Sequence, residues 1–442
     1  MSNLKAGFSR ICVTPPLGID IVGLYEHRYC TGVLDDLYVD ALAFDNGIQK
    51  VVFISIDALY LYKNEIDRYV GMIAQYCDLP KEAIFLATTH THCGPAIGES
   101  IQLGYKGFDD YDDRVGQALR DSAKYALEDL KDAKVYTAVN QAKDLAFIRR
   151  YYMKDGSVCT NPTIGDPNIA GPVTQPCEDV ILVKIERDGA DDICFVNFGV
   201  HPCSITGTEI TADFPHFVRT TLEKALDNTK CIFFTGFQGD VGCTDRRPLK
   251  GNWDLRNGYK RTEHIGRSIA GAVLQMCTLM KPMTDTTIAF GQKTVTIPSN
   301  QENDRLEEAR RINDLVKAGR SDEIIVPGAE MNKTVVMAEA ARILDLEFGP
   351  ESFDYTVSAI RIGDIVFGGL PGEPFTELGN RIREASPFDL TVLCCLVNGG
   401  GTYFPASSAY EQGGYEVATS YLRKGGDDIL VGGLSNLIAE LK

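Results

Sequence analysis

Residues 84–95 read IFLATTHTHCGP, a short apolar run that leads directly into a His-x-His segment. Such short apolar runs are typical of buried strands, and polar residues that follow a strand line the binding crevice at the edge of an open α/β sheet. Side chains two residues apart on an extended segment project to the same face, so His90 and His92 are expected to face one crevice. This stretch therefore predicts an α/β fold whose site lies in strand-end loops.

Similar apolar, β-branched runs alternate with longer amphipathic stretches along the whole chain, which predicts a mixed sheet core flanked by helices. Since no repeat or composition break is visible, residues 1–442 are expected to form a single catalytic domain, with two subdomains around a cleft as the alternative. Residues 151–178 contain many Gly, Pro and Asn and are expected to form a long ordered loop. Strands are predicted at 51–56, 83–87, 180–185, 193–198, 231–234, 364–367 and 391–396. Helices are predicted at 111–131, 214–227, 261–279, 302–318, 330–347 and 374–385.

Four further strand-like runs lead to residues that can bind metal or transfer protons, namely His201, Asp240, Glu373 and Tyr403. Imidazole nitrogens and a carboxylate oxygen suit zinc, and a catalytic zinc keeps one position open for water. His90, His201 and Glu373 are therefore candidate zinc ligands. The alternative interpretation is that these histidines are ordinary core or surface residues.

The bulk composition excludes several other classes of function. The 442 residues carry a formal net charge of −17, and no run of Lys and Arg interleaved with aromatic residues is present, which argues against nucleic acid as a partner. No apolar run approaches the length of a transmembrane segment, and the first residues lack the apolar centre of a secretory signal, so a cytoplasmic protein is expected. Thirteen cysteines, several within apolar runs, indicate reduced buried thiols rather than a disulfide framework.

The candidate residues lie in segments that resemble the neutral ceramidase family, in particular its N-terminal catalytic domain. The Thr-His-Thr-His-Ser-Gly-Pro segment of that family is matched at Thr89–Pro95, with Cys93 in place of the serine. Other matches are a strand-terminal histidine before Pro at His201, an Asp-Phe-Pro at 213–215, a Pro-Gly-Glu-Pro at 371–374 and a Tyr-rich segment at 403–415. The order and approximate spacing agree along almost the whole chain.

The resemblance implies a zinc ion held by His90, His201, Glu373 and Tyr403, and an amide bond cleaved by attack of zinc-bound water. It implies that His92 contacts the reacting carbonyl or the water. Further implied residues of the site are Arg149, with Arg150 as an adjacent competitor, and one tyrosine that donates a hydrogen bond, either Tyr415 or Tyr410. His92, Arg149 and the tyrosine hydroxyl would stabilise the oxyanion.

Two departures from the family bear on the substrate. Where the family has Gly-Asp-Val-Ser-Pro-Asn, this chain has Gly242 and Cys243 at the Ser-Pro positions, so the serine that engages the headgroup of ceramide is absent. The resemblance does not extend to the family's immunoglobulin-like C-terminal domain, which this chain is expected to lack. We therefore expect a short relative that acts on a small or polar N-acyl compound rather than on ceramide. Alternatives are an esterase or lactonase on the same zinc, or a zinc-containing protein that binds an acyl ligand without turnover; a homo-oligomer is compatible with the sequence.

Three more residues have two interpretations each. Asp240 is expected either to orient a metal-ligating histidine or to satisfy backbone amides in a tight turn. Asp57, which follows a strand, is expected either to support the site in the same way or to be a buried structural carboxylate. Cys93 is expected to be a reduced thiol of the pocket, with a role as metal ligand as the alternative.

Overall fold

The computed structural model describes residues 4–24, 27–100, 105–247, 258–301 and 304–442. Its larger sheet has nine strands, in the order β18-β16-β15-β10-β1-β5-β6-β7, with β20 paired to β10. The bounds are β1 Lys5–Cys12, β5 Tyr38–Asp45, β6 Lys50–Ile56, β7 Ile84–Thr88, β10 Lys131–Gln141, β15 Asp179–Arg187, β16 Asp192–Phe198, β18 Thr229–Thr235 and β20 Lys281–Pro282. The pairs β6–β7 and β16–β18 are parallel and most others are antiparallel, so the sheet is mixed, as predicted.

A second sheet of four strands, β21-β22-β23-β25, packs against the first. Its strands are β21 Ile288–Pro298, β22 Ser352–Ile362, β23 Ile365–Gly369 and β25 Leu390–Cys394. Phe53, Phe85, Phe195 and Phe234 of the larger sheet meet Phe367 of the second sheet in one buried cluster. Neighbouring residues of a strand point to opposite faces, so β6 turns Phe53 toward this cluster and Ile54 toward the helices on the other side.

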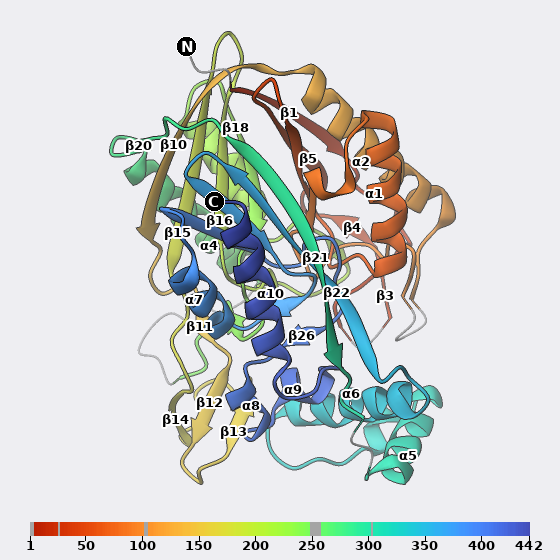
Figure 1. Ribbon diagram of the computed structural model, residues 1–442. Helices are drawn as coiled ribbons and strands as arrows, with labels where there is room; N and C mark the ends of the chain where they lie inside the picture. The colour runs from red at the N-terminus through yellow and green to blue at the C-terminus, as the bar shows by residue number, and fades with distance from the viewer. Residues whose placement is uncertain (1–3, 25–26, 101–104, 248–257, 302–303) are drawn as a thin grey trace.

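Helices cover the outer faces of both sheets, which gives four layers (Figure 1). Helices α1 and α2 pack on β1 and β5–β7, helices α3 and α4 pack on β15, β16 and β18, and helices α7 and α10 pack on the second sheet. Helices α5 and α6 form a separate pair beside the short helix α9. The bounds are α1 Lys63–Cys77, α2 Asp109–Glu128, α3 Phe214–Ala225, α4 Tyr259–Met276, α5 Leu306–Lys317, α6 Glu330–Glu347, α7 Thr376–Ala385, α8 Ser407–Tyr410, α9 Tyr415–Thr419 and α10 Gly426–Glu440.

The predicted α/β fold is confirmed, and every predicted strand and helix is present to within a few residues; residues 302 and 303 of the predicted 302–318 helix lie outside the described residues. The prediction of a long loop at 151–178 is wrong. This segment forms a small antiparallel sheet of β12 Arg150–Met153, β13 Val158–Thr160 and β14 Ile169–Pro172. Its first turn is closed by the amide of Gly156, which donates to Met153 O (3.0 Å), and Gly156 itself has φ 87°. The strands are short and partly exposed, so they lack the apolar alternation from which strands are predicted.

The two sheets are joined where their strands end. The amide of Cys395, after β25, donates to Thr235 O at the end of β18 (3.1 Å), and the amide of Asn398 donates to Leu86 O in β7 (2.8 Å). The side chain of Asn197 in β16 donates to Leu393 O in β25 (3.2 Å). These bonds bring the loops that follow β7, β16, β18, β23 and β25 to one place. Among the described residues, no helix combines the length and hydropathy needed to cross a bilayer.

The candidate metal centre

His90 and His92 lie on the loop that leaves β7. This loop is not extended, because the backbone of His90 has φ 72°, a conformation that is uncommon for residues other than glycine. The turn is held by the amide of His90, which donates to Ala58 O (2.9 Å), and by that of His92, which donates to Pro202 O (3.1 Å). The two rings converge nevertheless, with centroids 5.0 Å apart. The predicted proximity is therefore correct, although the extended geometry that suggested it is not.

His201 follows β16 and completes a cluster of three histidines. One ring nitrogen from each of His90, His92 and His201 lies within 4.8 Å of the other two. The Nδ1 atom of each ring lies at hydrogen-bond distance from a backbone carbonyl oxygen: His90 from Leu59 O (2.8 Å), His92 from Gly23 O (2.9 Å) and His201 from Gln238 O (2.9 Å). A carbonyl oxygen only accepts, so each Nδ1 carries the proton and, in a neutral ring, each Nε2 presents a lone pair.

Glu373 and Tyr403 reach the cluster from the second sheet. They are register partners in a short parallel ladder of β24 Glu373–Pro374 and β26 Tyr403–Phe404. The Oε2 atom of Glu373 lies 3.0 Å from His201 Nε2 and 3.3 Å from His90 Nε2. The ring of Tyr403 stacks on that of His201, with centroids 6.5 Å apart and planes inclined by 17°. All four residues predicted to hold zinc are therefore neighbours.

The donor set fits a divalent metal. Atoms held about 2.0–2.1 Å from a tetrahedral zinc lie about 3.3 Å from one another, close to the separations of Glu373 Oε2 from the two Nε2 atoms. Without a cation, an ionised carboxylate would face two nitrogen lone pairs across these distances, which is repulsive. His90 Nε2 and His92 Nε2 are also buried and have no hydrogen-bond partner in the described part of the chain. Unpaired buried polar atoms are costly, so this arrangement indicates a site built for a cation.

Burial and neighbouring charges set the protonation states. Burial lowers the pKa of His201 to about 3, and the guanidinium of Arg149 acts in the same direction. Burial and then His90 hold the pKa of His92 well below its usual value. Burial raises the pKa of Glu373, but His90 and His201 outweigh it and leave that pKa well below the ordinary range. In the metal-free centre at neutral pH, the rings of His92 and His201 are thus neutral and the carboxylate of Glu373 is ionised.

Arg149 faces the centre, whereas Arg150 does not. Arg149 follows β11 (Phe147–Ile148), which pairs with β19 (Val241–Gly242), and its Nη1 lies 3.4 Å from His201 Nε2. Its guanidinium also lies over the ring of Tyr403, 5.2 Å from the centroid. Arg150 instead donates from Nη2 to Gln412 Oε1 and Gly413 O, away from the histidines. Between the adjacent arginines, the structure brings only Arg149 to the predicted site.

The two candidate tyrosines are separated in the same way. The ring of Tyr415 lies 5.7 Å from that of Tyr403, and Arg149 lies over it at 5.9 Å. Tyr410 donates its hydroxyl to Leu422 O (2.8 Å), and burial raises its pKa to about 12. Tyr415 is therefore the tyrosine that lies beside the cluster.

Two buried residues at the centre were not predicted to have a role. Glu416 is fully buried and accepts a hydrogen bond from Arg149 Nε at 2.7 Å. Gln238, also fully buried, directs Nε2 toward Glu373 Oε2 at 3.4 Å. The position of Gln238 directly after β18 was a signal for a role in the site. Glu416 carried no such signal, because its contact with Arg149 spans 267 residues.

Asp240 and Asp57 are structural in their contacts. Asp240 Oδ1 accepts from the amide and hydroxyl of Thr376 at the start of α7 (2.8 and 2.9 Å). Asp57 forms a buried pair with Arg219, with 2.6 Å between Oδ2 and Nη2. For both residues these contacts favour the structural interpretation. Asp240, however, accepts from the first amide of helix α7 and not from an amide of its own turn.

The positions of the two family serines are occupied differently. Burial raises the pKa of the Cys93 thiol to about 11, and its Sγ lies 3.5 Å from Ile205 O. At Gly242, an added Cβ would come no closer than 3.7 Å to Arg149 Cβ, an ordinary contact. A side-chain Cβ therefore has room at Gly242, so crowding around the Cβ does not force a glycine there.

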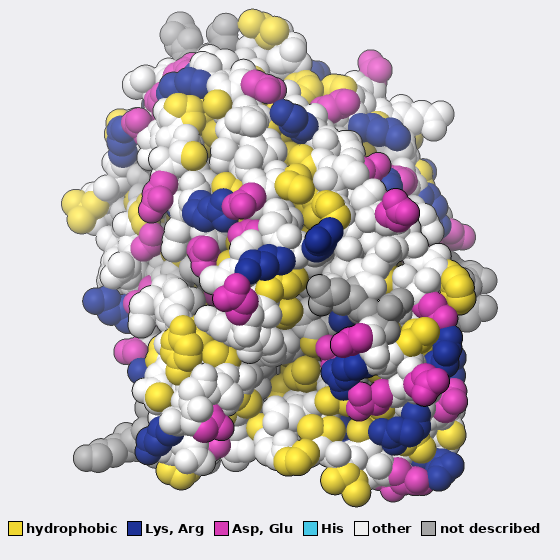
Figure 2. All heavy atoms as spheres, turned by 60° about the horizontal axis from the view of Figure 1, so that its bottom comes forward, with side chains coloured by type: hydrophobic (Ala, Val, Ile, Leu, Met, Phe, Trp, Pro, Cys, Tyr) yellow, Lys and Arg dark blue, Asp and Glu magenta, His cyan; other side chains and the backbone are white. Residues whose placement is uncertain are grey.

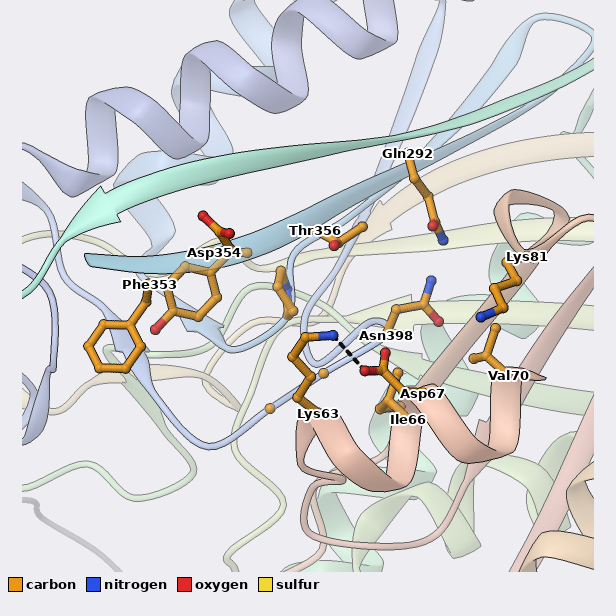
Figure 3. A pocket seen from close by; sticks show the side chains of 14 residues that line it. Lys63, Ile66, Asp67, Val70, Lys81, Gln292, Phe353, Asp354, Thr356 and Asn398 are labelled. Carbon is orange, nitrogen blue, oxygen red and sulfur yellow. Dashed lines mark hydrogen bonds and ion pairs between the residues drawn. The ribbon is translucent and has the colours of Figure 1, made fainter. Parts of the chain in front are cut away.

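A separate hollow of about 230 Å³ lies between α1 and the second sheet (Figure 3). Lys63 and Asp67 form an ion pair of 2.7 Å at its edge. Pro371 and Gly400, from the loops that carry Glu373 and Tyr403, also line it, but none of the clustered histidines does. This hollow is therefore distinct from the metal centre.

On the face seen in Figure 2, Lys and Arg are interspersed with Asp and Glu.

Comparison with solved structures shows which proteins share this fold. The chain is similar to the neutral ceramidase from Pseudomonas aeruginosa, with a TM-score of 0.74 and 14% identity over 99% of this chain and 74% of that chain. It is also similar to a ceramidase complexed with C2, with a TM-score of 0.73 and 14% identity over 99% of this chain and 75% of that chain. No protein-family model and no curated protein sequence matches the chain. The chain thus has the neutral ceramidase-like fold that its sequence predicts.

Proposed function

We propose that this protein is a zinc-dependent hydrolase that cleaves an amide bond in an N-acyl compound. The observation that carries the proposal is the convergence of one ring nitrogen from each of three histidines and the Glu373 carboxylate beside Arg149. His90, His201, Glu373 and Tyr403 would hold the zinc. Zinc in such a site lowers the pKa of a bound water to about 7 and polarises a carbonyl oxygen.

The remaining residues supply the other requirements of amide hydrolysis. The hydrogen bond between His92 Nδ1 and Gly23 O fixes the tautomer of the ring, so Nε2 is available to accept a proton and deliver it to the leaving amine. Arg149 Nη1, at the edge of the cluster, is placed to stabilise negative charge on the carbonyl oxygen. The hydroxyl of Tyr415 is a second donor for the same oxygen.

An N-acyl substrate is supported by the fold, since the two similar solved structures described above are ceramidases. Ceramide itself is less favoured, because Gly242 cannot supply the hydroxyl group that the serine of the family supplies. We therefore propose a smaller or more polar N-acyl compound. A buried centre formed by loops of both sheets is consistent with a small-molecule substrate.

The experiment combines elemental analysis of the purified protein with a panel of N-acyl amino acids, N-acyl amines, ceramides and simple esters. We expect about one zinc per chain and amide cleavage that stops after chelation and returns with added zinc. His264, which is exposed and lies outside the cluster, provides a control: H264Q should retain zinc and activity, whereas H201A should lose both. Cleavage of esters alone would replace the amidase with an esterase. Zinc without turnover would indicate a binding protein, and absence of zinc would contradict the proposal.

A further inference from the structure

Glu416 lies behind Arg149, on the side away from the histidines. Its side chain has no exposed surface, and both carboxylate oxygens are engaged. Oε1 accepts from Arg149 Nε at 2.7 Å, and Oε2 accepts from Thr160 Oγ1 at 2.9 Å. Thr160 Oγ1 in turn accepts from the amide of Tyr415 at 3.2 Å. This chain of bonds ties α9 and the small 151–178 sheet to the arginine.

The contacts of Arg149 account for each edge of its guanidinium. Nε donates to Glu416, and Nη2 donates to Gly239 O at 2.8 Å. Nη1 faces the centre, 3.4 Å from His201 Nε2, and the guanidinium also forms a hydrogen bond with the side chain of Tyr403. A guanidinium is a rigid plane, so two bonds on the outer edges fix where the third group points. The charge of Glu416 also balances that of an arginine that lies beside a cation site.

We propose that Glu416 is a positioning residue that holds Arg149 so that Nη1 faces the reacting carbonyl oxygen. The inference rests on the proposed function for its catalytic meaning, but the hold on Arg149 is a property of this chain alone. A misplacement of about 1 Å costs on the order of 100-fold in rate, so E416Q should lower kcat/KM by about 100-fold, mainly in kcat. Zinc content should stay near that of the wild type.

A double-mutant cycle separates positioning from general structural support. R149M removes the arginine charge, and the double variant R149M/E416Q removes both buried charges together. If Glu416 acts through Arg149, the double variant is no slower than R149M. If the fold-losses in kcat/KM of R149M and E416Q multiply in the double variant, the two residues act independently and the proposal is overturned. E416D, which retains the charge, should recover part of the activity. T160V removes the donor to Oε2 and the acceptor of the Tyr415 amide but leaves the bond between Glu416 and Arg149, so it should cost less than 10-fold and provides a second variant should E416Q not fold.

A readout that does not depend on activity is the Nε–H signal of Arg149 in ¹⁵N-arginine-labelled protein, assigned by its loss in R149M. We expect a sharp signal, slow to exchange with water, in the wild type, and a shifted, fast-exchanging signal in E416Q. T160V leaves the bond between Nε and Oε1 in place, so its signal should shift less. An unchanged signal would overturn the proposal. If the wild type cleaves nothing on the panel, the proposed function fails, and this signal still decides whether Glu416 holds Arg149.

Discussion

The two sheets build the metal centre in different ways. The larger sheet supplies three histidines, each held by a bond from Nδ1 to a backbone carbonyl, so these rings are fixed by the local chain. The second sheet supplies Glu373 and Tyr403, which are fixed by their pairing with each other and by side chains such as Gln238. The first group could hold a metal ion, and in the proposed function the second would complete the charge and the ligand set. Variants on the two sides should therefore fail in different ways.

The largest effect is expected on the histidine side, for H201A. A four-ligand zinc site contributes on the order of 10–16 kcal/mol, so one ligand is worth about 3 kcal/mol, or about 100-fold in affinity. We expect zinc affinity to fall by at least this factor and hydrolysis to fall to background. Competition with a chromophoric chelator measures the affinity. Unchanged affinity would remove His201 from the ligand set.

The adjacent arginines provide a matched pair. R149K replaces the donor nearest the cluster and should lower kcat by about 10²–10³-fold, the usual cost of losing one donor to an oxyanion. R150K loses bonds to Gln412 and Gly413, so it should lower the melting temperature with little effect on kcat. Steady-state kinetics and thermal unfolding of both variants test this difference. Equal kinetic losses would mean that orientation toward the cluster is irrelevant.

Acidification should destabilise the metal-free protein through the same histidines. Burial keeps the pKa of His201 at about 3, whereas the unfolded chain binds that proton near pH 6.5. The unfolded state then binds more protons between these values, so the free energy of unfolding falls as pH drops below about 6.5. Between pH 7.5 and 5.5 the loss from His201 is on the order of 1 kcal/mol. Urea unfolding of chelator-treated wild type and H201Q measures the free energy of unfolding at both pH values, and it should decrease less in the variant. Equal decreases in the two proteins would show that His201 is not the cause.

The two candidate tyrosines, Tyr415 and Tyr410, test which hydroxyl group takes part in catalysis. Y415F removes a hydroxyl beside Tyr403 and Arg149 and should lower kcat by about 10-fold, as expected for one neutral hydrogen bond in the transition state. Y410F removes the bond to Leu422 O and should cost about 1 kcal/mol of stability without a change in kcat. If Y410F lowered kcat more than Y415F, Tyr410 rather than Tyr415 would be the tyrosine that takes part in catalysis.

The smallest effect on stability is expected for G242S. The added Cβ meets only ordinary contacts, so the melting temperature should stay within a few degrees of the wild type. The new hydroxyl should raise kcat/KM for ceramide relative to the smaller N-acyl substrates, by about 10-fold if it gains one hydrogen bond. G242A provides the control for size alone. If G242S and G242A changed the ratio of kcat/KM values for ceramide and the smaller substrates equally, the hydroxyl group would have no role in selectivity.

Strand-end residues were the part of the site that the sequence could predict. His90, His201, Glu373 and Tyr403 follow apolar strands or short loops, and strands of this kind end at a common edge. Glu416 could not be predicted, because nothing local marks a buried carboxylate whose partner is far away in the chain. The stacking of two sheets was also not predicted, since strands buried between helices and strands buried between a helix layer and a second sheet are equally apolar. Helices α1 and α10 were not predicted. In α10, Gly433 interrupts the apolar pattern, and an added Cβ there would come within 2.5 Å of Val295.

The most direct test of the metal centre is a crystal structure of the zinc-loaded protein with anomalous data collected on both sides of the zinc edge. We predict one zinc peak within about 2.0–2.3 Å of His90 Nε2, His201 Nε2 and Glu373 Oε2, with Arg149 Nη1 facing its open side. A peak elsewhere, or a fully loaded protein in which these three atoms remain without a metal, would contradict the account.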